Sequence, residues 1–333
     1  MSTPVLQVSD LAVQFPTPTG AVHAVNGVSF TILAGETVAI VGESGSGKSV
    51  TALALMGLLA APGRQTGGEI LFAGESLNNL SDRAYRNLRG REMAMIFQDP
   101  LSSLNPAFRV GTQIVEAMVT HGVNKADART RSIELMASVG IAHPELRARD
   151  YPHQFSGGMR QRAMIAMAIA NSPRLLIADE PTTALDVTIQ AQVLDVLLAA
   201  KRETNSALLL ITHDLGVVAG MADRVLVMYA GRIIEEGLVD EVLISPRHPY
   251  TQGLLAALPR LDQDRRTSLR TIPGTPPNLI NDTEACALAP RCEYAEDSCF
   301  RIRPALKLAV NAISSSHRVA CLRADDLVRT DGP

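Results

Sequence analysis

The segment at residues 42–49, Gly-Glu-Ser-Gly-Ser-Gly-Lys-Ser, constrains the fold of this chain more than any other feature. It fits the pattern G-x-x-x-x-G-K-[ST] and follows an apolar run at residues 37–41 that is typical of a strand buried on both faces. An apolar helix is predicted directly after it, at residues 49–59. The glycines let backbone N–H groups surround an anion at the positive end of that helix. The sequence therefore predicts an α/β fold that binds a nucleoside triphosphate.

The whole loop is expected to take part in nucleotide binding. Within it, Lys48 is expected to reach the β- and γ-phosphates and the Ser49 hydroxyl to bind Mg²⁺. The alternative is a glycine-rich turn with an incidental Lys-Ser pair, which the flanking strand and helix argue against. The predicted nucleotide-binding residues of this segment are Gly42, Glu43, Ser44, Gly45, Ser46, Gly47, Lys48, Ser49 and Val50.

A second apolar run, at residues 175–178, ends in two adjacent carboxylates, Asp179 and Glu180. Adjacent residues at the end of a strand have different surroundings and can take different roles. Asp179 is expected to hold the hydration shell of Mg²⁺, and Glu180 to accept a proton from the attacking water. Strands that end in solvated acids are common, so this interpretation depends on the phosphate loop.

The remaining pattern indicates alternating strands and helices around a mainly parallel sheet. Further strands are predicted at residues 5–15, 22–32, 68–72 and 207–211, a helix at 188–201, and mostly helical structure from 77 to 169. Proline becomes frequent after residue 235. We therefore expect a first domain at 1–235, with a helical subdomain at about 100–170, and a second domain at 236–333, joined around residues 232–242.

Composition excludes several classes of function. The net charge is −3 and aromatic residues make up 4%, with no Trp, which argues against nucleic acid as a partner. No apolar run approaches the roughly 18 residues that span a bilayer. The N-terminus has no basic region followed by an apolar one, so a secretory signal is not expected. These features predict a cytosolic protein that reaches the membrane only through a partner.

The segment Ser156-Gly157-Gly158-Met159-Arg160-Gln161-Arg162 resembles the signature motif of ATP-binding cassette (ABC) ATPases. Other elements of that family follow in order: Gln98 resembles the Q-loop, residues 184–186 the D-loop and His213 the switch histidine, and Phe15 lies where the family places an aromatic ring against adenine. The resemblance implies an ABC nucleotide-binding domain. Such a domain has a RecA-like parallel sheet core, an antiparallel β subdomain and a helical subdomain, here with a small Cys-containing C-terminal domain.

The resemblance also implies roles for these residues. Mg²⁺ is expected to be held by Ser49 and Gln98, and by Asp179 through water. Glu180 is expected to be the base that activates water, and His213 to stabilise the γ-phosphate. Two subunits are expected to pair head to tail, so that Ser156, Gly157 and Gly158 complete the ATP site of the partner. The segment 98–109 is expected to transmit the ATPase cycle to the permease.

The C-terminal part narrows the family. Residues 248–255 and 272–277, followed by Pro290-Arg291-Cys292, resemble the extension of ATP-binding subunits from peptide and nickel importers. Phe155 and Met159 replace the Leu and Gln of the commonest signature, as in one of the two paired ATPases of that family. The implied function is an ATPase that powers peptide import.

The implied partners are a second, different ATPase chain, two membrane permeases and an extracytoplasmic solute-binding protein, with no nucleic acid. The implied location is the cytoplasmic face of the inner membrane, where the chain is peripheral. The alternatives are an importer of nickel or of another small solute, and a soluble ABC ATPase without a transport role.

All four cysteines lie in the last 48 residues, at Cys286, Cys292, Cys299 and Cys321. A reducing cytosol disfavours disulfides, so the cluster indicates a metal site. The spacing C-x5-C-x6-C-x21-C is wider than the close pairs typical of zinc sites and leaves an iron–sulfur cluster, zinc and buried free thiols open. The family resemblance implies a structural [4Fe–4S] cluster, although Ala285 and Leu288 depart from the expected Gly and Phe. His317 is expected to be a solvated or capping residue rather than a ligand.

Overall fold

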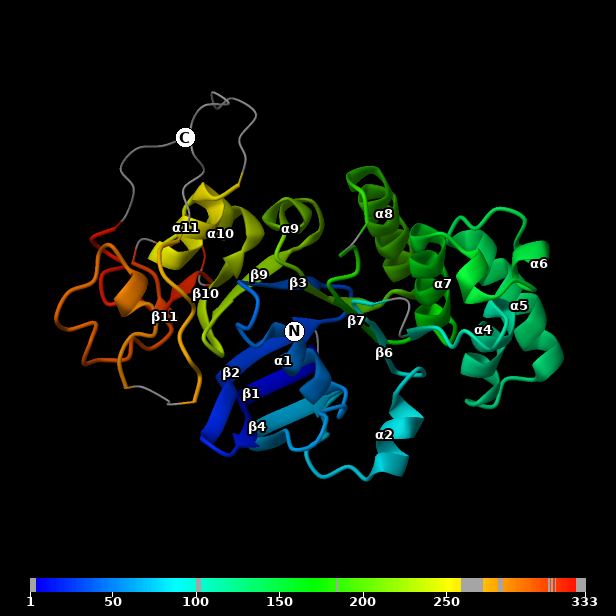
Figure 1. The fold of residues 1–333 in the computed structure, drawn as a ribbon, viewed down its shortest axis with the longest axis horizontal. Helices are drawn as coiled ribbons and strands as arrows, with labels where there is room; N and C mark the ends of the chain where they lie inside the picture. The colour runs from blue at the N-terminus through cyan, green and yellow to red at the C-terminus, as the bar shows by residue number, and fades with distance from the viewer. Residues whose placement is uncertain are drawn as a thin grey trace. The chain divides into compact units, whose positions relative to one another are not determined.

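The chain forms two compact units, each assembled from separate stretches of sequence (Figure 1). The structure, a computed structural model, describes residues 4–99, 103–183, 185–258, 272–280, 284–310, 312, 314 and 316–327. Within this part, the first unit is drawn from Met1–Gln7, Thr31–Thr37 and Ile70–Ile211, and the second from Val8–Phe30, Val38–Glu69 and Thr212–Pro333. Residues 100–102 of the expected permease-contact segment and Ala184 of the expected D-loop lie outside the described residues.

The first unit is built on three parallel strands, in the order β8–β7–β6. They are β6 (Met93–Ile96), β7 (Leu175–Asp179) and β8 (Ala207–Ile211). Every residue of β7 and β8 is buried, which explains why both are continuous apolar runs instead of alternating ones. The parallel register brings the carboxyl ends of the strands to one edge, where polar residues follow them.

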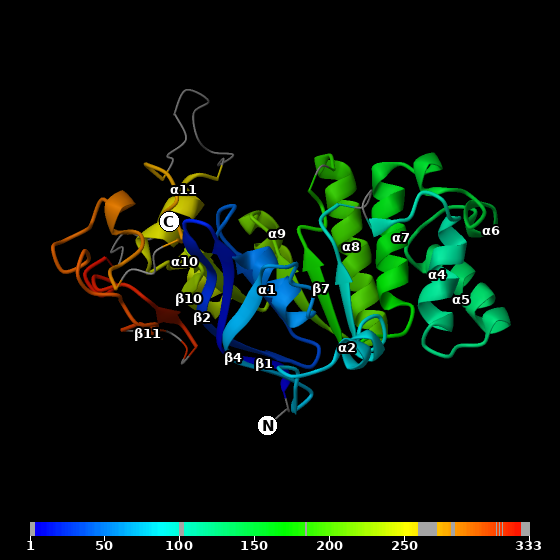
Figure 2. The ribbon, with the colours of Figure 1, turned by 60° about the horizontal axis from the view of Figure 1, so that its bottom comes forward.

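The first unit also contains several helices. Their bounds are α2 (Asp82–Leu88), α4 (Val110–Val119), α5 (Lys125–Ser138), α6 (Pro144–Arg147), α7 (Gly157–Ile169) and α8 (Val187–Thr204), with a 3₁₀ turn at Pro152–Gln154. The helices α4 to α7 lie together in both views (Figures 1 and 2), and α7 also packs against α8 and β6. Side chains of Ser81, Asn124 and Asp186 accept backbone hydrogen bonds at the first turns of α2, α5 and α8.

The second unit contains the strands β3 (Thr37–Val41), β9 (Arg224–Tyr229), β10 (Arg232–Leu238), β11 (Lys307–Leu308) and β12 (Arg318–Val319). Their order is β11–β12–β10–β9–β3, in which β3 and β9 are parallel and the other pairs antiparallel. The strand β10 occupies the segment expected to be a linker. The boundary expected at residues 235 and 236 thus falls inside a buried strand that pairs with β9 and β12.

The second unit also contains short helices. They are α1 (Lys48–Leu55), α9 (Leu215–Met221), α10 (Val239–Ile244) and α11 (Pro249–Ala256), with a 3₁₀ turn at Ala289–Arg291.

A separate four-stranded sheet has the order β2–β1–β4–β5, with bounds Gly20–Leu33, Pro4–Thr17, Arg64–Phe72 and Glu75–Ser76. None of the helices in the described parts of the chain is both long and apolar enough to cross a membrane.

The predicted strands at residues 37–41 and 207–211 are confirmed, and the helix predicted at 188–201 extends from Val187 to Thr204. The prediction of mostly helical structure from 77 to 169 missed β6, a strand of only four residues. The hairpin of β9 and β10 was also missed. Its turn requires positive φ angles at Ala230 (50°) and Gly231 (76°), and the sequence offers only one glycine there.

Candidate functional site

The phosphate loop between β3 and α1 depends on glycine at two positions. Gly42 has φ of 153°, and a Cβ atom there would lie 2.1 Å from the Met228 carbonyl oxygen. Gly47 has φ of 107°, and its Cβ would lie 2.4 Å from the Ala24 carbonyl oxygen. Any side chain at these positions would collide with backbone, so the close packing of the loop against its neighbours explains both glycines.

Lys48 opens α1 and is only 5% exposed. Its ammonium group donates hydrogen bonds to the carbonyl oxygens of Gly42 (2.7 Å) and Glu43 (2.9 Å), which hold the charge inside the curve of the loop. The buried hydroxyl of Ser46 makes no hydrogen bond to any described residue. The other predicted residues of the segment, Ser44, Gly45, Ser49 and Val50, lie in the loop and the first turn of α1.

Glu43 of the phosphate loop is held by residues from the C-terminal part of the second unit. Its carboxylate accepts two hydrogen bonds from Arg291, of 2.9 and 3.2 Å, and its backbone N–H donates to the Tyr250 hydroxyl at 2.7 Å. Arg291 also donates to the hydroxyl of Tyr229. The ring centroids of Tyr229 and Tyr250 are 4.6 Å apart. The hydrogen bonds to the Glu43 carboxylate hold the pKa of Arg291 above its usual range.

Sequence reasoning missed these contacts. Tyr250 and Arg291 both lie in segments that resemble the importer extension, but no spacing in the sequence pairs them with Glu43. The only signal was their position. Arg291 directly precedes Cys292, and Tyr250 is the second residue of α11, directly after Pro249.

The two carboxylates at the end of β7 differ in their surroundings. Asp179 ends the strand and is 6% exposed. Glu180 is more accessible and adopts a positive φ of 46°, and its Oε2 atom accepts hydrogen bonds from the Gln98 side chain (3.1 Å) and the Thr183 hydroxyl (2.8 Å). The structure thus brings Gln98 and Glu180 together within the first unit. These two donors fix the orientation of the carboxylate.

The Ser-Gly-Gly segment forms the N-terminus of α7. The Ser156 hydroxyl accepts a hydrogen bond from the Met159 N–H at 3.3 Å and so caps the helix. A Cβ on Gly158 would lie 2.6 Å from Cγ2 of Ile189 in α8, so this glycine permits the close packing of the two helices. Gly157 is less crowded, with 3.3 Å from its Cβ position to Cδ2 of Leu185.

Two further predicted residues lie in the second unit. His213 is exposed in the connection between β8 and α9, where Asp214 caps the helix by accepting hydrogen bonds from two backbone N–H groups. Phe15 lies on β1, and its ring packs against Gly63 so closely that a Cβ there would be 2.4 Å from the ring. The Phe15 ring is only partly buried. An accessible aromatic face of this kind suits stacking on a base.

The four cysteines converge although their spacing in the sequence is wide. Cys286, Cys292, Cys299 and Cys321 all line one small cavity in the second unit, and the Cys286 N–H donates to the Cys299 carbonyl oxygen at 2.9 Å. Burial raises the pKa of the Cys286 and Cys292 thiols, and that of Cys321 to about 11. Among the described residues, no group of three or more His, Cys, Asp or Glu side chains is arranged to hold a metal ion.

The expectation for His317 is wrong. The ring is only 2% exposed, and its Nε2 atom lies 2.9 Å from the carboxylate of Glu235, which is completely buried. Glu235 also accepts the backbone N–H groups of Arg247 (2.6 Å) and His248 (3.0 Å). His317 is therefore part of a buried polar network that satisfies a carboxylate inside β10, neither a solvated residue nor a helix cap.

Comparison with known families finds two matches in succession along the chain. Residues 25–183 match the family model described as ABC transporter. Residues 234–299 match the family model described as oligopeptide/dipeptide transporter, C-terminal region. The first match covers the phosphate loop and the signature motif, and the second covers three of the four cysteines.

Individual relatives match over nearly the whole chain. The oligopeptide transport ATP-binding protein OppD of Bacillus subtilis is 53% identical, over 91% of this chain and 85% of the relative. The OppD of Salmonella typhimurium is 52% identical over 96% and 93% of the two chains. The dipeptide transport ATP-binding protein DppD of Escherichia coli is 50% identical over 93% and 95%.

Solved structures agree with these matches. The dimeric ATP-binding cassette MJ0796, in a post-hydrolysis state bound to ADP and Pi, superposes with a TM-score of 0.63 at 25% identity. The matched region covers 70% of this chain and 98% of the cassette.

Proposed function

This chain belongs to the ATP-binding proteins of the ABC transporter family, in the branch of oligopeptide and dipeptide transport, and on that premise we propose that it hydrolyses ATP to power peptide import through a membrane permease. The observation that carries the proposal is the order of two regions in one chain. A complete cassette is followed by the C-terminal region of oligopeptide transporters, and the relatives that share both are named for peptide transport.

The phosphate loop is proposed to bind the nucleotide. Backbone N–H groups of residues 42–49 and the N-terminus of α1 would hold the phosphates, with the Lys48 ammonium moving from the Gly42 and Glu43 carbonyls onto them. The partly exposed Phe15 ring is proposed to stack on adenine. The distances within the loop support the first assignment, because Lys48 already lies inside the curve that the phosphates would fill.

Hydrolysis is assigned to the residues that follow β7. We propose that Glu180 accepts the proton of the attacking water and that Gln98 and Thr183 orient its carboxylate, as their hydrogen bonds to Oε2 suggest. Ser49, Gln98 and Asp179 offer the oxygen donors that Mg²⁺ prefers, and the ion would neutralise phosphate charge when bound. His213 is proposed to contact the γ-phosphate.

A second ATPase subunit is proposed to complete each site. The capped N-terminus of α7, with Ser156, Gly157 and Gly158, would be an anion-binding element separate from the phosphate loop in sequence. One chain has no need of two such elements for one nucleotide, whereas two chains paired head to tail would use both. The similarity to a dimeric cassette supports this arrangement.

The further partners follow from the branch of the family. We propose a different chain as the second ATPase, two permease subunits in the membrane, contacted through the segment around residues 98–109, and an extracytoplasmic solute-binding protein. The chain would then be a peripheral protein at the cytoplasmic face of the inner membrane.

The four cysteines are proposed to hold a structural [4Fe–4S] cluster. The donor set fits, because four thiols from distant positions line one cavity and Fe–S clusters are held by four thiolates. A cluster places several iron atoms between its ligands, so the thiols do not have to converge on a single ion. When bound, the cluster would cross-link three loops of the C-terminal segment that contain little regular secondary structure.

Uptake measurements test the proposed function. Cells that lack this chain but keep its permeases should lose uptake of a radiolabelled tripeptide, and the wild-type chain should restore it. Uptake of ⁶³Ni²⁺, measured in the same cells, distinguishes the nickel importer. Peptide uptake that is unaffected by loss of the chain would contradict the proposal.

A further inference from the structure

Glu43 of the phosphate loop is held at each of its polar groups. Its carbonyl oxygen accepts a hydrogen bond from Lys48 (2.9 Å), its N–H donates to the Tyr250 hydroxyl (2.7 Å), and its carboxylate accepts two bonds from Arg291 (2.9 and 3.2 Å). Lys48 is the residue proposed above to move from this carbonyl onto the phosphates. Nucleotide binding would therefore act directly on a residue that two C-terminal side chains hold.

Tyr250 lies next to the cavity that the four cysteines line. It is the second residue of α11 and only 1% exposed, and the two residues before it, His248 and Pro249, are part of the lining. The Nδ1 atom of His248 accepts a hydrogen bond from the Tyr250 N–H at 3.1 Å. A movement of this wall of the cavity would therefore displace the Tyr250 hydroxyl, and with it the Glu43 N–H.

Arg291 lies in a turn with a cysteine at each end. The Ala289 N–H donates to the Cys286 carbonyl oxygen (3.0 Å), and the Cys292 N–H donates to the Ala289 carbonyl oxygen (3.3 Å). Arg291 directly precedes Cys292, and its side chain is 7% exposed. Because the turn is this short, the positions of Cys286 and Cys292 determine where the Arg291 side chain begins.

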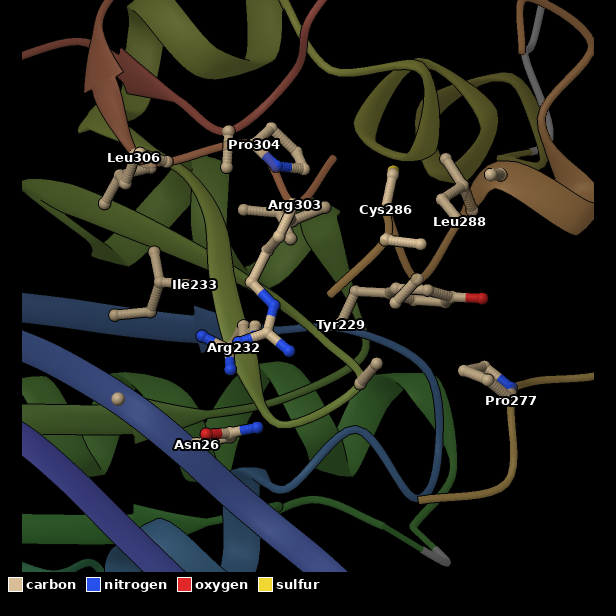
Figure 3. Close-up of a pocket in the computed structure, with 18 of the residues that line it drawn as sticks. Asn26, Tyr229, Arg232, Ile233, Pro277, Cys286, Leu288, Arg303, Pro304 and Leu306 are labelled. Carbon is tan, nitrogen blue, oxygen red and sulfur yellow. The ribbon is translucent and has the colours of Figure 1, made fainter. Parts of the chain in front are cut away.

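The same turn is bordered by two cavities. Cys286, Leu288 and Ala289 line both the cysteine cavity and a larger cavity of about 670 Å³. Figure 3 shows the larger cavity, with Cys286 and Leu288 in its wall together with Tyr229, a hydrogen-bond partner of Arg291. Atoms that line a cavity lack packing partners on that side. The turn can therefore shift at a smaller cost in packing than a turn inside a filled core.

We propose that Arg291 and Tyr250 are positioning residues that couple the two sites, so that nucleotide on the phosphate loop and the closed arrangement of the cysteine cavity stabilise each other. The coupling rests on the proposed function, because it requires nucleotide on this loop. Phosphates held by the loop restrict its conformations, so Glu43 holds Arg291 and Tyr250 more firmly. Coupling between two sites is reciprocal, so opening of the cysteine cavity lowers the affinity for nucleotide by the same factor.

Thiol labelling of the full chain, as purified, tests the coupling. Mass spectrometry measures the rate at which N-ethylmaleimide reacts with the cysteines, with and without Mg²⁺ and a saturating non-hydrolysable ATP analogue. Any metal or cluster on the thiols must leave before they react, so the rate reports opening of the cavity in either form. The analogue should slow the labelling of Cys286 and Cys292 at least about fivefold, the lower end of typical coupling between sites.

The affinity for a fluorescent ATP analogue is measured first, so that labelling is compared at saturation. A wild-type chain that binds no analogue would contradict the proposed function, and with it the premise of the coupling. A wild-type chain that binds the analogue and is labelled at an unchanged rate would overturn the coupling alone.

Conservative substitutions then identify the route. Tyr250→Phe removes only the hydroxyl, and Arg291→Lys keeps the charge without the paired hydrogen bonds. In each variant the saturating analogue should slow labelling less than about twofold, because the coupling is lost. Tyr85→Phe, in α2 of the first unit, and Arg301→Lys, at an exposed position, are the matched controls and should keep full protection. Full protection in both Tyr250→Phe and Arg291→Lys would overturn the proposal, because nucleotide would then protect the thiols by another route.

Discussion

Arg291 forms a two-pronged ion pair with Glu43, so that a residue next to a cysteine of the C-terminal segment holds the phosphate loop across 248 positions of sequence. The Arg291 side chain is 7% exposed and also donates to the Pro273 carbonyl oxygen. Planar, paired hydrogen bonds of this kind fix direction as well as distance. The C-terminal segment is thus part of the support of the phosphate loop.

Replacing Arg291 should weaken nucleotide binding. In Arg291→Ala the Glu43 carboxylate loses its partner, and charge-assisted hydrogen bonds contribute about 1.5–3 kcal/mol each. We expect the KM for ATP to rise on the order of tenfold, with a smaller change in kcat, measured by steady-state phosphate release. Arg301→Ala is the control on the surface of the same segment. An unchanged KM would show that the loop keeps its shape without this pair.

Lys48→Ala should abolish ATP binding, because this substitution removes the ammonium group that the loop curls around. Binding of a fluorescent ATP analogue measures the effect, and circular dichroism checks that the chain still folds. Lys125→Ala, at an exposed position in the first turn of α5, should bind the analogue normally. Normal affinity in Lys48→Ala would refute the assignment of the phosphate loop.

Glu180→Gln should bind ATP but hydrolyse it slowly. The amide keeps the size of the carboxylate and cannot accept the proton, so turnover should fall by roughly 10²–10⁴. Single-turnover hydrolysis measures the loss, and size-exclusion chromatography with ATP and the partner ATPase should detect an accumulated dimer. Glu134→Gln replaces an exposed carboxylate of α5 and serves as the control. Near-normal turnover in Glu180→Gln would assign the base to another residue.

The purified protein should be brown if the four cysteines hold an iron–sulfur cluster, and Cys292→Ser should lose the visible absorbance. Substitution of the adjacent exposed residue, Glu293→Gln, should leave the spectrum unchanged. Iron and zinc contents measured by mass spectrometry complete the test. A colourless protein that contains zinc would contradict the cluster.

Stability should fall in mild acid because of His248. Burial lowers the pKa of this histidine from 6.5 to about 4, despite the nearby Glu235 carboxylate, and its Nδ1 atom must stay unprotonated to accept the Tyr250 N–H. The unfolded chain binds the proton first, so stability that is fully present above pH 6.5 is lost as the pH falls toward 4.

The loss from this one group amounts to roughly 3 kcal/mol, from about 1.4 kcal/mol for each pKa unit. Urea denaturation between pH 4 and 7 measures it. His248→Gln should flatten this dependence, whereas substitution of the exposed His153→Gln should leave it unchanged. An identical pH dependence in both variants would show that His248 contributes nothing to it.

The sequence was most informative where function depends on a short continuous segment. The strand at 37–41, the phosphate loop and the helix after it could be predicted together, because periodicity, glycine spacing and the Lys-Ser pair all lie within about twenty residues. The capping Ser156 and the two adjacent acids at the end of β7 could be found for the same reason. Their roles in ATP hydrolysis remain predictions.

The sequence failed where a segment is short or lies far along the chain from its partner. The four residues of β6 are too few to show the alternation of apolar and polar residues that predicts a strand. The strand β10 contains two glutamates, which argue against a buried strand when only the sequence is considered. Glu235 is tolerated there only because His317 and two backbone N–H groups surround it. No residue close to Glu235 in the sequence indicates these partners, so the sequence predicted a linker where the structure has a strand.

The amino-acid order alone was enough to predict the strand, loop and helix around residues 37–55, because backbone conformation within a few residues follows from local sterics and hydrogen bonding, and its motifs were enough to identify the family. The tertiary structure decided which distant groups meet: Glu43 with Arg291, Gln98 with Glu180, and the four thiols in one cavity. Such contacts depend on how whole strands and loops pack. The free energy of that packing is distributed over many residues, so no single motif predicts it.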